Sequence, residues 1–419
     1  MRIIHTSDWH LGRQFGPMSL RADQEAFADW LVDLVEDQGA ELLVIAGDLY
    51  DRAIAPVDAI ELFRTTVRRV RSAGAVVAAI TGNHDGADRV ASYSELLDAS
   101  GFYLRGGYER VGQVITHEFS DGPLDLALLP FLDPQAAPYG FGVDQRDAGT
   151  GAGDRDPGDG RADEDASDPG HTGEGHSTVD LVEQRRRRTH DSVLDAAAAL
   201  ARESLGAPRS LAVAHAYVTG ATPSESERQL VVGGTGEVPS TVFGGFSYTA
   251  LGHLHRPQTA GAETVRYSGT PLAYSFSEQH DKSVVVIDME PDGTATIEQV
   301  PVGVGRRVRT VEGAMAHLLG SRDLDDAHDC FVRAVVTDRS TVLDARATLA
   351  RRFPHIVEVR LMPDGKDPDV GAAPIDVSEL PPIEAVRQFW AAAEGSEPPE
   401  DIDGMLVTAT GAALAGGTP

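Results

Sequence analysis

Buried-type apolar runs alternate with amphipathic stretches over roughly the first 135 residues of this chain. Four short runs are almost wholly aliphatic or β-branched, which predicts buried strands: Ile3–Thr6, Leu42–Ala46, Val76–Ile80 and Leu124–Leu129. After the first of them, apolar residues such as Phe27, Leu31 and Leu34 recur at helical spacing, and a second amphipathic stretch follows Pro56. This alternation predicts a layered α/β domain that binds ligands at the carboxyl ends of its strands.

The pattern stops between about residues 140 and 178, where glycine, aspartate and proline dominate. Such a segment cannot bury enough apolar surface to offset the entropy of ordering it, so we predict a disordered acidic insertion. A helix is predicted from about Val179 to Leu205. Further strands are predicted at Leu211–Ala214, Tyr248–Leu251, Val265–Ser268 and Ser283–Met289. They complete a first domain over residues 1–300.

A second, smaller pattern occupies residues 301–372. It predicts, in order, strand Arg307–Val311, helix Gly313–Leu319, strand Phe331–Thr337, helix Thr341–Phe353 and strand Ile356–Leu361. We expect a small α/β accessory domain. In residues 373–419, a proline-rich acidic connector leads to a short helix near Ile383–Ala393, and the last residues, 411 to 419, are typical of a frayed tail.

Composition narrows the class of protein. Of the 419 residues, 41% are hydrophobic and 24% are charged, as in ordinary soluble proteins. No apolar run reaches the roughly 18 residues that a membrane helix needs, and the N-terminus enters a strand without a leader. The single cysteine, Cys330, excludes an intrachain disulfide, which fits a reducing cytoplasm. We therefore expect a cytoplasmic protein that does not enter the membrane.

The net charge of −29 argues against a nucleic-acid partner, because affinity for phosphate comes largely from lysine and arginine. Part of that acidity lies in the predicted insertion, however. Bound divalent cations also invert the local field where a substrate phosphate would sit. The charge therefore does not exclude DNA as a substrate.

Five short motifs, nearly all directly after a predicted strand, carry side chains that bind metals. They are Asp8-Trp9-His10, Gly47-Asp48, Gly82-Asn83-His84-Asp85, His215 and Gly252-His253-Leu254-His255. A two-metal hydrolase needs ligands that hold two cations roughly 3.5–4 Å apart. Carboxylate, imidazole and amide oxygen suit manganese, iron or zinc. We predict that the metal ligands are Asp8, His10, Asp48, Asn83, His215, His253 and His255, with Asp48 as the bridge.

Alternation along a continued strand would point Asp8 and His10 in the same direction. The side chain of His84 should point away from that of its neighbour Asn83, so we predict that it contacts the scissile phosphate and assists the leaving oxygen. Asp85 is expected to orient the His84 imidazole, and Asp51 is a further candidate in the outer layer of the site.

Each motif alone is weak evidence. A single histidine at a strand end is more often packed than ligating, and Gly-Asn-His-Asp also suits a turn. Together, in this order and each near a strand, the motifs predict a metal-dependent phosphoester hydrolase.

Taken in order, the motifs resemble the calcineurin-like metallophosphoesterase superfamily. Residues 1–12 (MRIIHTSDWHLG), 46–51 (AGDLYD), 81–85 (TGNHD) and 267–277 (YSGTPLAYSFS) are more closely similar to the SbcD family, the nuclease subunits of bacterial SbcCD complexes. The resemblance covers residue 1 to about 395 and is strongest in residues 1–105 and 245–290. The insertion and the acidic composition depart from the family pattern.

The resemblance implies a four-layer β-sandwich flanked by helices, a small α/β capping domain and a C-terminal helix that docks on SbcC, an SMC-like ATPase. It implies that one metal is held by Asp8, His10, Asp48 and His255, and the other by Asp48, Asn83, His215 and His253, with His84 as the catalytic histidine. The implied activity is manganese-dependent: 3′-to-5′ exonuclease action on double-stranded DNA and endonuclease action on single strands and hairpins. The implied roles are DNA repair, recombination and replication, by a nuclease homodimer within a heterotetramer.

Several alternatives stay open at this point. A phosphodiesterase for nucleotides or other small phosphoesters would use the same metal core, and a non-enzymatic scaffold is disfavoured by the complete ligand set. Phe389 and Trp390 are either anchors for the ATPase or core residues, and the run Arg185–Arg188 is either a DNA contact or a solvated helix face. Helices near Pro56–Arg71 and Ser92–Ala99 would form the dimer contact that the resemblance implies.

Overall fold

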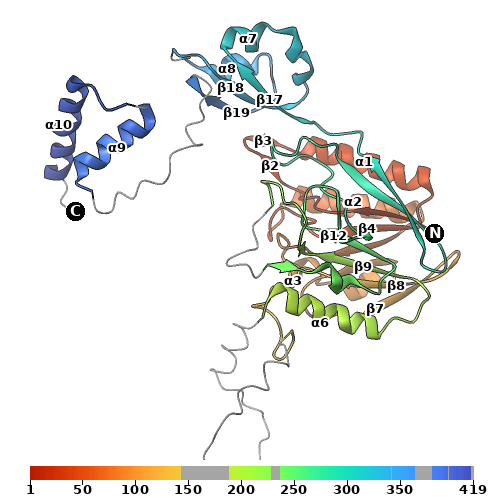
Figure 1. Cartoon of the computed structure of the whole chain (residues 1–419). Helices are drawn as coiled ribbons and strands as arrows, with labels where there is room; N and C mark the ends of the chain where they lie inside the picture. The colour runs from red at the N-terminus through yellow and green to blue at the C-terminus, as the bar shows by residue number, and fades with distance from the viewer. Residues whose placement is uncertain (143–187, 228–235, 341, 364–379, 395, 417–419) are drawn as a thin grey trace, which may run out of the picture. The chain divides into compact units, whose positions relative to one another are not determined.

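The computed structural model describes residues 1–142, 188–227, 236–340, 342–363, 380–394 and 396–416 (Figure 1). Almost all of the predicted insertion, with His171 and His176, lies outside the described residues. The chain divides into two compact units: residues 1–309 with 329–331, and residues 310–328 with 332–419.

The first sheet of the first unit has six strands in the order β16-β15-β1-β4-β5-β6. Their bounds are β1 Arg2–Thr6, β4 Leu42–Ala46, β5 Val76–Ile80, β6 Phe102–Arg105, β15 Ser283–Met289 and β16 Ala295–Pro301. Strands β1, β4, β5 and β6 run parallel, and β15 pairs antiparallel with β1. Every residue of β4 and β5 is buried, because both faces of the sheet are covered. This explains why these strands show unbroken apolar runs.

The second sheet also has six strands, in the order β13-β14-β12-β9-β8-β7. Their bounds are β7 Val114–Phe119, β8 Gly122–Leu129, β9 Ser210–His215, β12 Tyr248–Gly252, β13 Gln258–Ala260 and β14 Ala262–Tyr267. Strands β8, β9, β12 and β14 are parallel. Small elements complete the unit: β2 Gln14–Phe15, β3 Met18–Ser19, β10 Tyr217–Val218, β11 Glu237–Val238 and the 3-10 helix η2 Ser240–Phe243.

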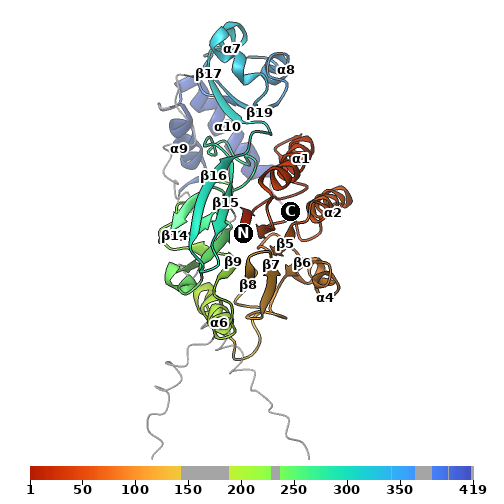
Figure 2. The ribbon, with the colours of Figure 1, turned by 90° about the vertical axis from the view of Figure 1, so that its right-hand side faces the viewer.

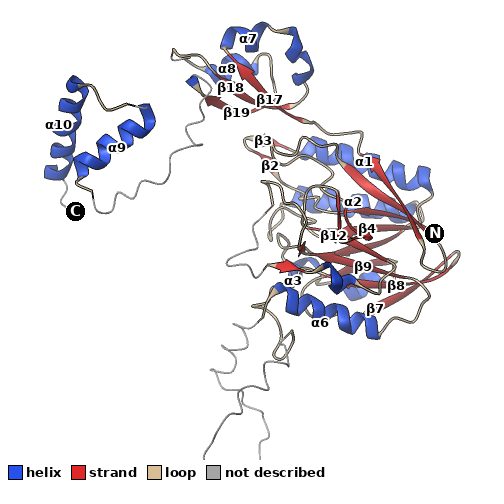
Figure 3. Ribbon diagram, viewed as in Figure 1, coloured by secondary structure: helices blue, strands red, loops and turns tan. Residues whose placement is uncertain are grey.

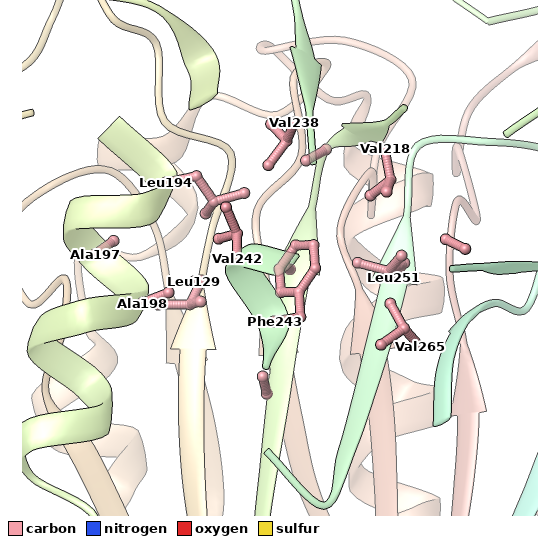
Figure 4. Close-up of a cluster of buried hydrophobic side chains, with 14 of the residues drawn as sticks. Leu129, Leu194, Ala197, Ala198, Val218, Val238, Val242, Phe243, Leu251 and Val265 are labelled. Atoms are coloured by element: carbon pink, nitrogen blue, oxygen red, sulfur yellow. The ribbon is translucent and has the colours of Figure 1, made fainter. Parts of the chain in front are cut away.

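Helices flank the two stacked sheets, so the first unit has four layers (Figures 1 and 3). The helices are α1 Arg21–Gln38, α2 Val57–Ser72, α3 Ala87–Val90, α4 Ser94–Asp98 and α6 His190–Glu203. Helices α1, α2 and α4 lie on the side of the first sheet and α6 on the side of the second (Figure 2). Side chains such as Val44 and Val213 fill the space between the sheets. A second cluster, including Leu194 and Phe243, fills the space between the second sheet, α6 and η2 (Figure 4). The predicted fold class is confirmed.

Helix α6 begins at His190, and residues 179–187 of the predicted helix lie outside the described part of the chain. Thr189 and Ser192 form a capping box, in which each side chain accepts a hydrogen bond from the other residue's backbone N–H. Arg188 is buried and donates to the carbonyl oxygens of Ala137 and Pro138, each at 2.7 Å. This residue is therefore neither a DNA contact nor part of a solvated face. Residues 185–187 lie outside the described part of the chain.

The second unit contains a three-stranded sheet in the order β17-β18-β19 and two C-terminal helices. Its elements are β17 Val308–Gly313 (shared with the first unit at its start), α7 Met315–Gly320, the 3-10 helix η3 Arg322–Ala327, β18 Phe331–Val336, α8 Ala345–Ala350, β19 Ile356–Leu361, α9 Pro382–Glu394 and α10 Glu400–Gly416. A bidentate ion pair joins Arg387 of α9 to Asp403 of α10, with both N···O distances 2.7 Å.

The frayed tail predicted from residue 411 is wrong for residues 411–416, since α10 continues to Gly416, and residues 417–419 lie outside the described part of the chain. Alanines between the glycines of this segment favour helix strongly enough to offset them. Within the described part of the chain, no helix is both long and apolar enough to cross a membrane.

Candidate metal centre

The predicted ligands lie at the carboxyl ends of five parallel strands drawn from both sheets. Asp8 and His10 follow β1, Asp48 follows β4, Asn83 follows β5, His215 ends β9, and His253 and His255 follow β12. Parallel strands that share a direction present their carboxyl ends at one edge. Three groups of side chains at this edge have ligand atoms within 4.8 Å of one another: Asp8, His10 and His255; His10, Asp48 and His84; Asp8, Asp48 and His215.

Four of these residues have a left-handed backbone. The φ angle is 54° at Asp8, 43° at His10, 48° at Asp48 and 103° at His253. In the described part of the first unit these are the non-glycine residues with positive φ. Such conformations cost about 1–3 kcal/mol each and gather at functional sites. They also correct the expectation for Asp8 and His10: strand alternation ends at Thr6, and left-handed turns, not pleating, aim both side chains into the site.

Asp48 lies between histidines that come from different sheets. Its Oδ2 atom is 3.5 Å from His10 Nε2 and 3.7 Å from His215 Nε2. A carboxylate between two such nitrogens could bridge two cations, which is the role predicted for Asp48. Asp48 Oδ1 accepts a hydrogen bond from the His84 backbone N–H at 2.9 Å, which fixes the carboxylate plane.

Imidazole nitrogens and an amide oxygen converge on this site, and at least two of them, His215 Nε2 and Asn83 Oδ1, are acceptors that face each other. His215 Nδ1 donates to the Ala46 carbonyl oxygen at 2.9 Å, so in the neutral ring Nε2 carries a lone pair. That nitrogen lies 3.0 Å from Asn83 Oδ1, and His253 Nδ1 lies 3.1 Å from the same oxygen. Both ring nitrogens of His10 are buried without a hydrogen-bond partner. Buried acceptors that face one another are costly unless a cation lies between them, so the residues present fit metal ions.

The charge states also suit metal binding. Burial lowers the pKa of His10 and His253 well below the usual value, and it lowers the pKa of His215 as well. The three imidazoles are therefore neutral at pH 7, which is the form that ligates. Burial, reinforced by the nearby Asp48 carboxylate, raises the pKa of Asp8 well above its usual range. Two carboxyl groups at such close quarters favour a bound cation.

His84 lies beside the ligands with its ring edge-on to His10, the centroids 4.7 Å apart. Its Nδ1 donates to the Asp51 backbone carbonyl oxygen at 2.9 Å, which leaves Nε2 as the nitrogen available to a substrate. The Asp51 side chain accepts from Arg13 at 3.2 Å, and its Oδ1 is 3.7 Å from His10 Nδ1. The role of Asp51 in the outer layer of the site stays a prediction.

Asp85 does not have the predicted role of orienting the His84 imidazole. Its carboxylate accepts three backbone N–H groups: Leu49 at 3.1 Å, Tyr50 at 2.9 Å and Gly82 at 2.8 Å. Asp85 thus ties the loop after β4 to the loop after β5. Burial and the charge of Asp48 raise the pKa of Asp85 to about 7, against the opposing effect of the three donors.

Three residues near the site were missed by the sequence analysis. Tyr274 donates its hydroxyl to the Trp9 carbonyl oxygen at 2.6 Å and so fastens the left-handed turn between Asp8 and His10. Glu278 and Ser226 both contact Nδ1 of the His255 ring. The motif at residues 267–277 contains Tyr274 and ends one residue before Glu278. The polar residues of this motif were the feature of the sequence that could have indicated supporting residues here.

Comparisons with known proteins agree with this geometry. Residues 1–135 match the family model described as Calcineurin-like phosphoesterase. The D subunit of the SbcCD nuclease of Bacillus subtilis (strain 168) is 32% identical over 311 residues, which is 73% of this chain and 71% of that protein. The chain belongs to the SbcD family of nuclease subunits.

Other SbcD proteins are similar over much of their length. That of Escherichia coli (strain K12) is 27% identical over 76% of this chain and 72% of its own length, and that of Staphylococcus epidermidis (strain ATCC 12228 / FDA PCI 1200) is 24% identical over 85% and 84%. A solved structure, TT1561 of Thermus thermophilus, covers 72% of this chain and 98% of its own at 14% identity with a TM-score of 0.33, too low to bear on the fold. Family membership makes the chain a nuclease subunit and a metal-dependent hydrolase.

Proposed function

We propose that this chain cuts DNA phosphodiester bonds at a pair of divalent cations held where its two sheets meet. The observation that carries the proposal is the convergence of carboxylate, amide and imidazole lone pairs from five strand ends. Asp8, His10, Asp48 and His255 would hold one cation, and Asp48, Asn83, His215 and His253 the other. These oxygen and nitrogen donors suit manganese, which the family resemblance favours.

The protein's own residues supply positioning and proton transfer. Bound cations would supply positive charge to the scissile phosphate and lower the pKa of water. His84 is anchored through Nδ1 by the Asp51 carbonyl oxygen, so its Nε2 can contact a phosphate oxygen or protonate the leaving oxygen. Arg13, held by Asp51 at 3.2 Å, adds a fixed positive charge beside the substrate position.

The partner that we propose is an SbcC-type ATPase, bound through α9. Phe389 on this helix is 74% exposed and Trp390 is half-buried, so Phe389 is not packed in a core within the described residues. Exposed Met405 on α10 adds to the apolar surface of the same helical pair. A large aromatic side chain left in water fits an anchor for a partner.

A nuclease homodimer within a heterotetramer is proposed through α2 and α4. Val57, Ile60, Tyr93 and Leu96 are exposed apolar residues on or next to these helices. A surface that gathers such residues is typical of a protein–protein contact. The sheet of residues 308–361 would be the capping domain that helps to hold DNA. The work of the complex would be cytoplasmic DNA repair, recombination and replication.

The test uses the purified chain with Mn²⁺, alone and with its SbcC-type partner. Substrates are duplex DNA labelled at either end, hairpin DNA and cyclic nucleotides. We expect 3′-to-5′ shortening and hairpin opening, lost in His84→Ala and kept in the matched control His117→Ala, whose ring bonds Tyr103 away from the site. Turnover of cyclic nucleotides with DNA left intact would instead establish a small-phosphoester phosphodiesterase.

A further inference from the structure

A buried polar network contacts the Nδ1 atom of His255. The His255 side chain is only 2% exposed, and that of Glu278 is fully buried. Ser226 Oγ lies 2.6 Å from His255 Nδ1 and also hydrogen-bonds Glu278 Oε1. Glu278 Oε1 is itself 3.4 Å from His255 Nδ1. At His10 the comparable carboxylate, that of Asp51, is 3.7 Å from Nδ1, beyond hydrogen-bond distance.

Chemistry fixes the direction of these hydrogen bonds. Lys282 forms an ion pair with Glu278 Oε2, and the Tyr274 backbone N–H donates to the same oxygen at 3.3 Å. An ionised carboxylate has no proton to give, so the Ser226 hydroxyl must donate to Glu278 Oε1. With its only proton used in this way, the Ser226 hydroxyl can contact His255 Nδ1 only as an acceptor, from Nδ1–H. The His255 ring therefore carries its proton on Nδ1, and the lone pair is on Nε2.

We infer that Ser226 and Glu278 are positioning residues that hold His255 in the tautomer and orientation needed to bind a cation through Nε2. This inference rests on the metal ligation proposed above and adds residues that neither the motifs nor the ligand set contain. Outer partners of this kind raise the basicity of a ligating imidazole and fix its ring, and their loss typically costs 10–100-fold in metal affinity.

The backbone of the same histidine is held from the same loop. Glu227 Oε1 accepts the His255 backbone N–H at 2.7 Å, while Glu227 Oε2 accepts the Ser224 N–H at 2.6 Å. The segment of residues 224–227 thus forms hydrogen bonds with both the backbone and the ring of His255. Lys282 also donates to Thr270 Oγ1 at 2.7 Å, which joins the motif of residues 267–277 to the network. The polar residues of this motif therefore support a ligand that follows a different strand.

The first test reads the tautomer in wild-type, metal-free protein. Nitrogen-15 NMR of selectively labelled histidine distinguishes a protonated ring nitrogen from one with a lone pair, and His255→Gln identifies the signal of interest. We expect the proton on Nδ1 in wild type. A proton held on Nε2 would overturn the inference without any variant having to fold.

The second test measures Mn²⁺ affinity and stoichiometry by calorimetry, with the Tm of the metal-free protein as the structural readout. Ser226→Ala should weaken the binding step that involves His255 by about 10–100-fold, while the Tm of the metal-free protein falls by no more than the equivalent of about 1–3 kcal/mol, the cost of one lost buried hydrogen-bond partner. Ser226→Thr keeps the hydroxyl and should restore affinity to within a few-fold of wild type.

The outcomes separate the two proposals. A wild-type protein that binds no Mn²⁺ contradicts the proposed function. A wild type that binds Mn²⁺ no more tightly than Ser226→Ala contradicts the positioning role alone. A lower Tm of the metal-free Ser226→Ala protein with unchanged Mn²⁺ affinity would give Ser226 a purely structural role and also contradict it.

Discussion

Replacement of Asp85 provides a graded test of how the two ligand-bearing loops are held together. Its carboxylate accepts one backbone N–H through Oδ1, from Tyr50, and two through Oδ2, from Leu49 and Gly82. Asp85→Asn can keep its carbonyl oxygen toward the last two donors, but its amide NH2 then faces the Tyr50 N–H. Asp85→Ala removes all three acceptor contacts.

The expected losses follow from the number of orphaned donors. A buried donor left without its partner costs about 1–3 kcal/mol. Asp85→Asn should therefore lower the free energy of unfolding by about 1–3 kcal/mol. Asp85→Ala should cost about 3–5 kcal/mol, below the full sum because water can enter the space left by the carboxylate. Against a total stability of about 5–15 kcal/mol, the alanine variant is severely weakened and the asparagine variant stays folded.

Urea unfolding of the metal-free proteins at constant pH measures the free energy of unfolding of wild type and both variants. Calorimetry with Mn²⁺ measures how far each substitution weakens metal binding. Because the Tyr50 and Leu49 amides follow Asp48 directly, both variants should also bind Mn²⁺ more weakly. If Asp85 acted through the His84 imidazole, asparagine and alanine would alter the pH profile of cleavage and leave unfolding almost unchanged. That result, or equal free energies of unfolding for the two variants, would refute the claim that Asp85 joins the loop after β4 to the loop after β5.

Three further outcomes are expected. Gly252→Ala should lower the free energy of unfolding by at least about 1–3 kcal/mol and weaken Mn²⁺ binding, because the added Cβ would lie 1.8 Å from the Ala46 carbonyl oxygen that orients His215. The control Gly206→Ala has open space at its Cβ and should change neither the Tm nor the affinity for Mn²⁺. Burial lowers the pKa of His5 in the folded protein to about 3, whereas the pKa of this histidine in the unfolded chain is about 6.5, so the unfolded state takes up the proton first as the pH falls. Between pH 6.5 and 5 the free energy of unfolding should therefore fall by about 1.6 kcal/mol more in wild type than in His5→Gln, as urea titrations at the two pH values would show. Removal of metal with a chelator should lower the Tm by the equivalent of about 2.7 kcal/mol per site filled at 100 times its Kd, and a Tm independent of metal would contradict binding to the native state.

Strands were predictable where burial on both faces makes the sequence uniformly apolar. Strands β4 and β5 match their predicted bounds for this reason. The edge strand β7 was missed because its residues alternate between half-buried and exposed positions and include His117 and Glu118. Helix α10 was missed because glycine and threonine interrupt its alanines, and local composition then resembles a tail.

The convergence of the predicted ligands could be foreseen because each of them closely follows a strand, and the carboxyl ends of parallel strands meet at one edge of a sheet. The supporting contacts could not, since they join residues far apart in the chain: Ser226 to Glu278 spans 52 positions, and Asp85 to Leu49 spans 36. The sequence suggested instead that Asp85 orients His84, because the two residues are adjacent and no contact between distant residues can be read from the sequence.

In this site, the side chains of sequence neighbours diverge: Asn83 turns toward the histidines of the second sheet, His84 toward the Asp51 carbonyl and Asp85 toward the backbone of the loop after β4. Because the side chains of residues 83–85 contact three different parts of the site, the backbone must change direction at each of these residues. Local periodicity can therefore predict which strand ends meet, while the task of each side chain depends on the turn geometry that follows the strand.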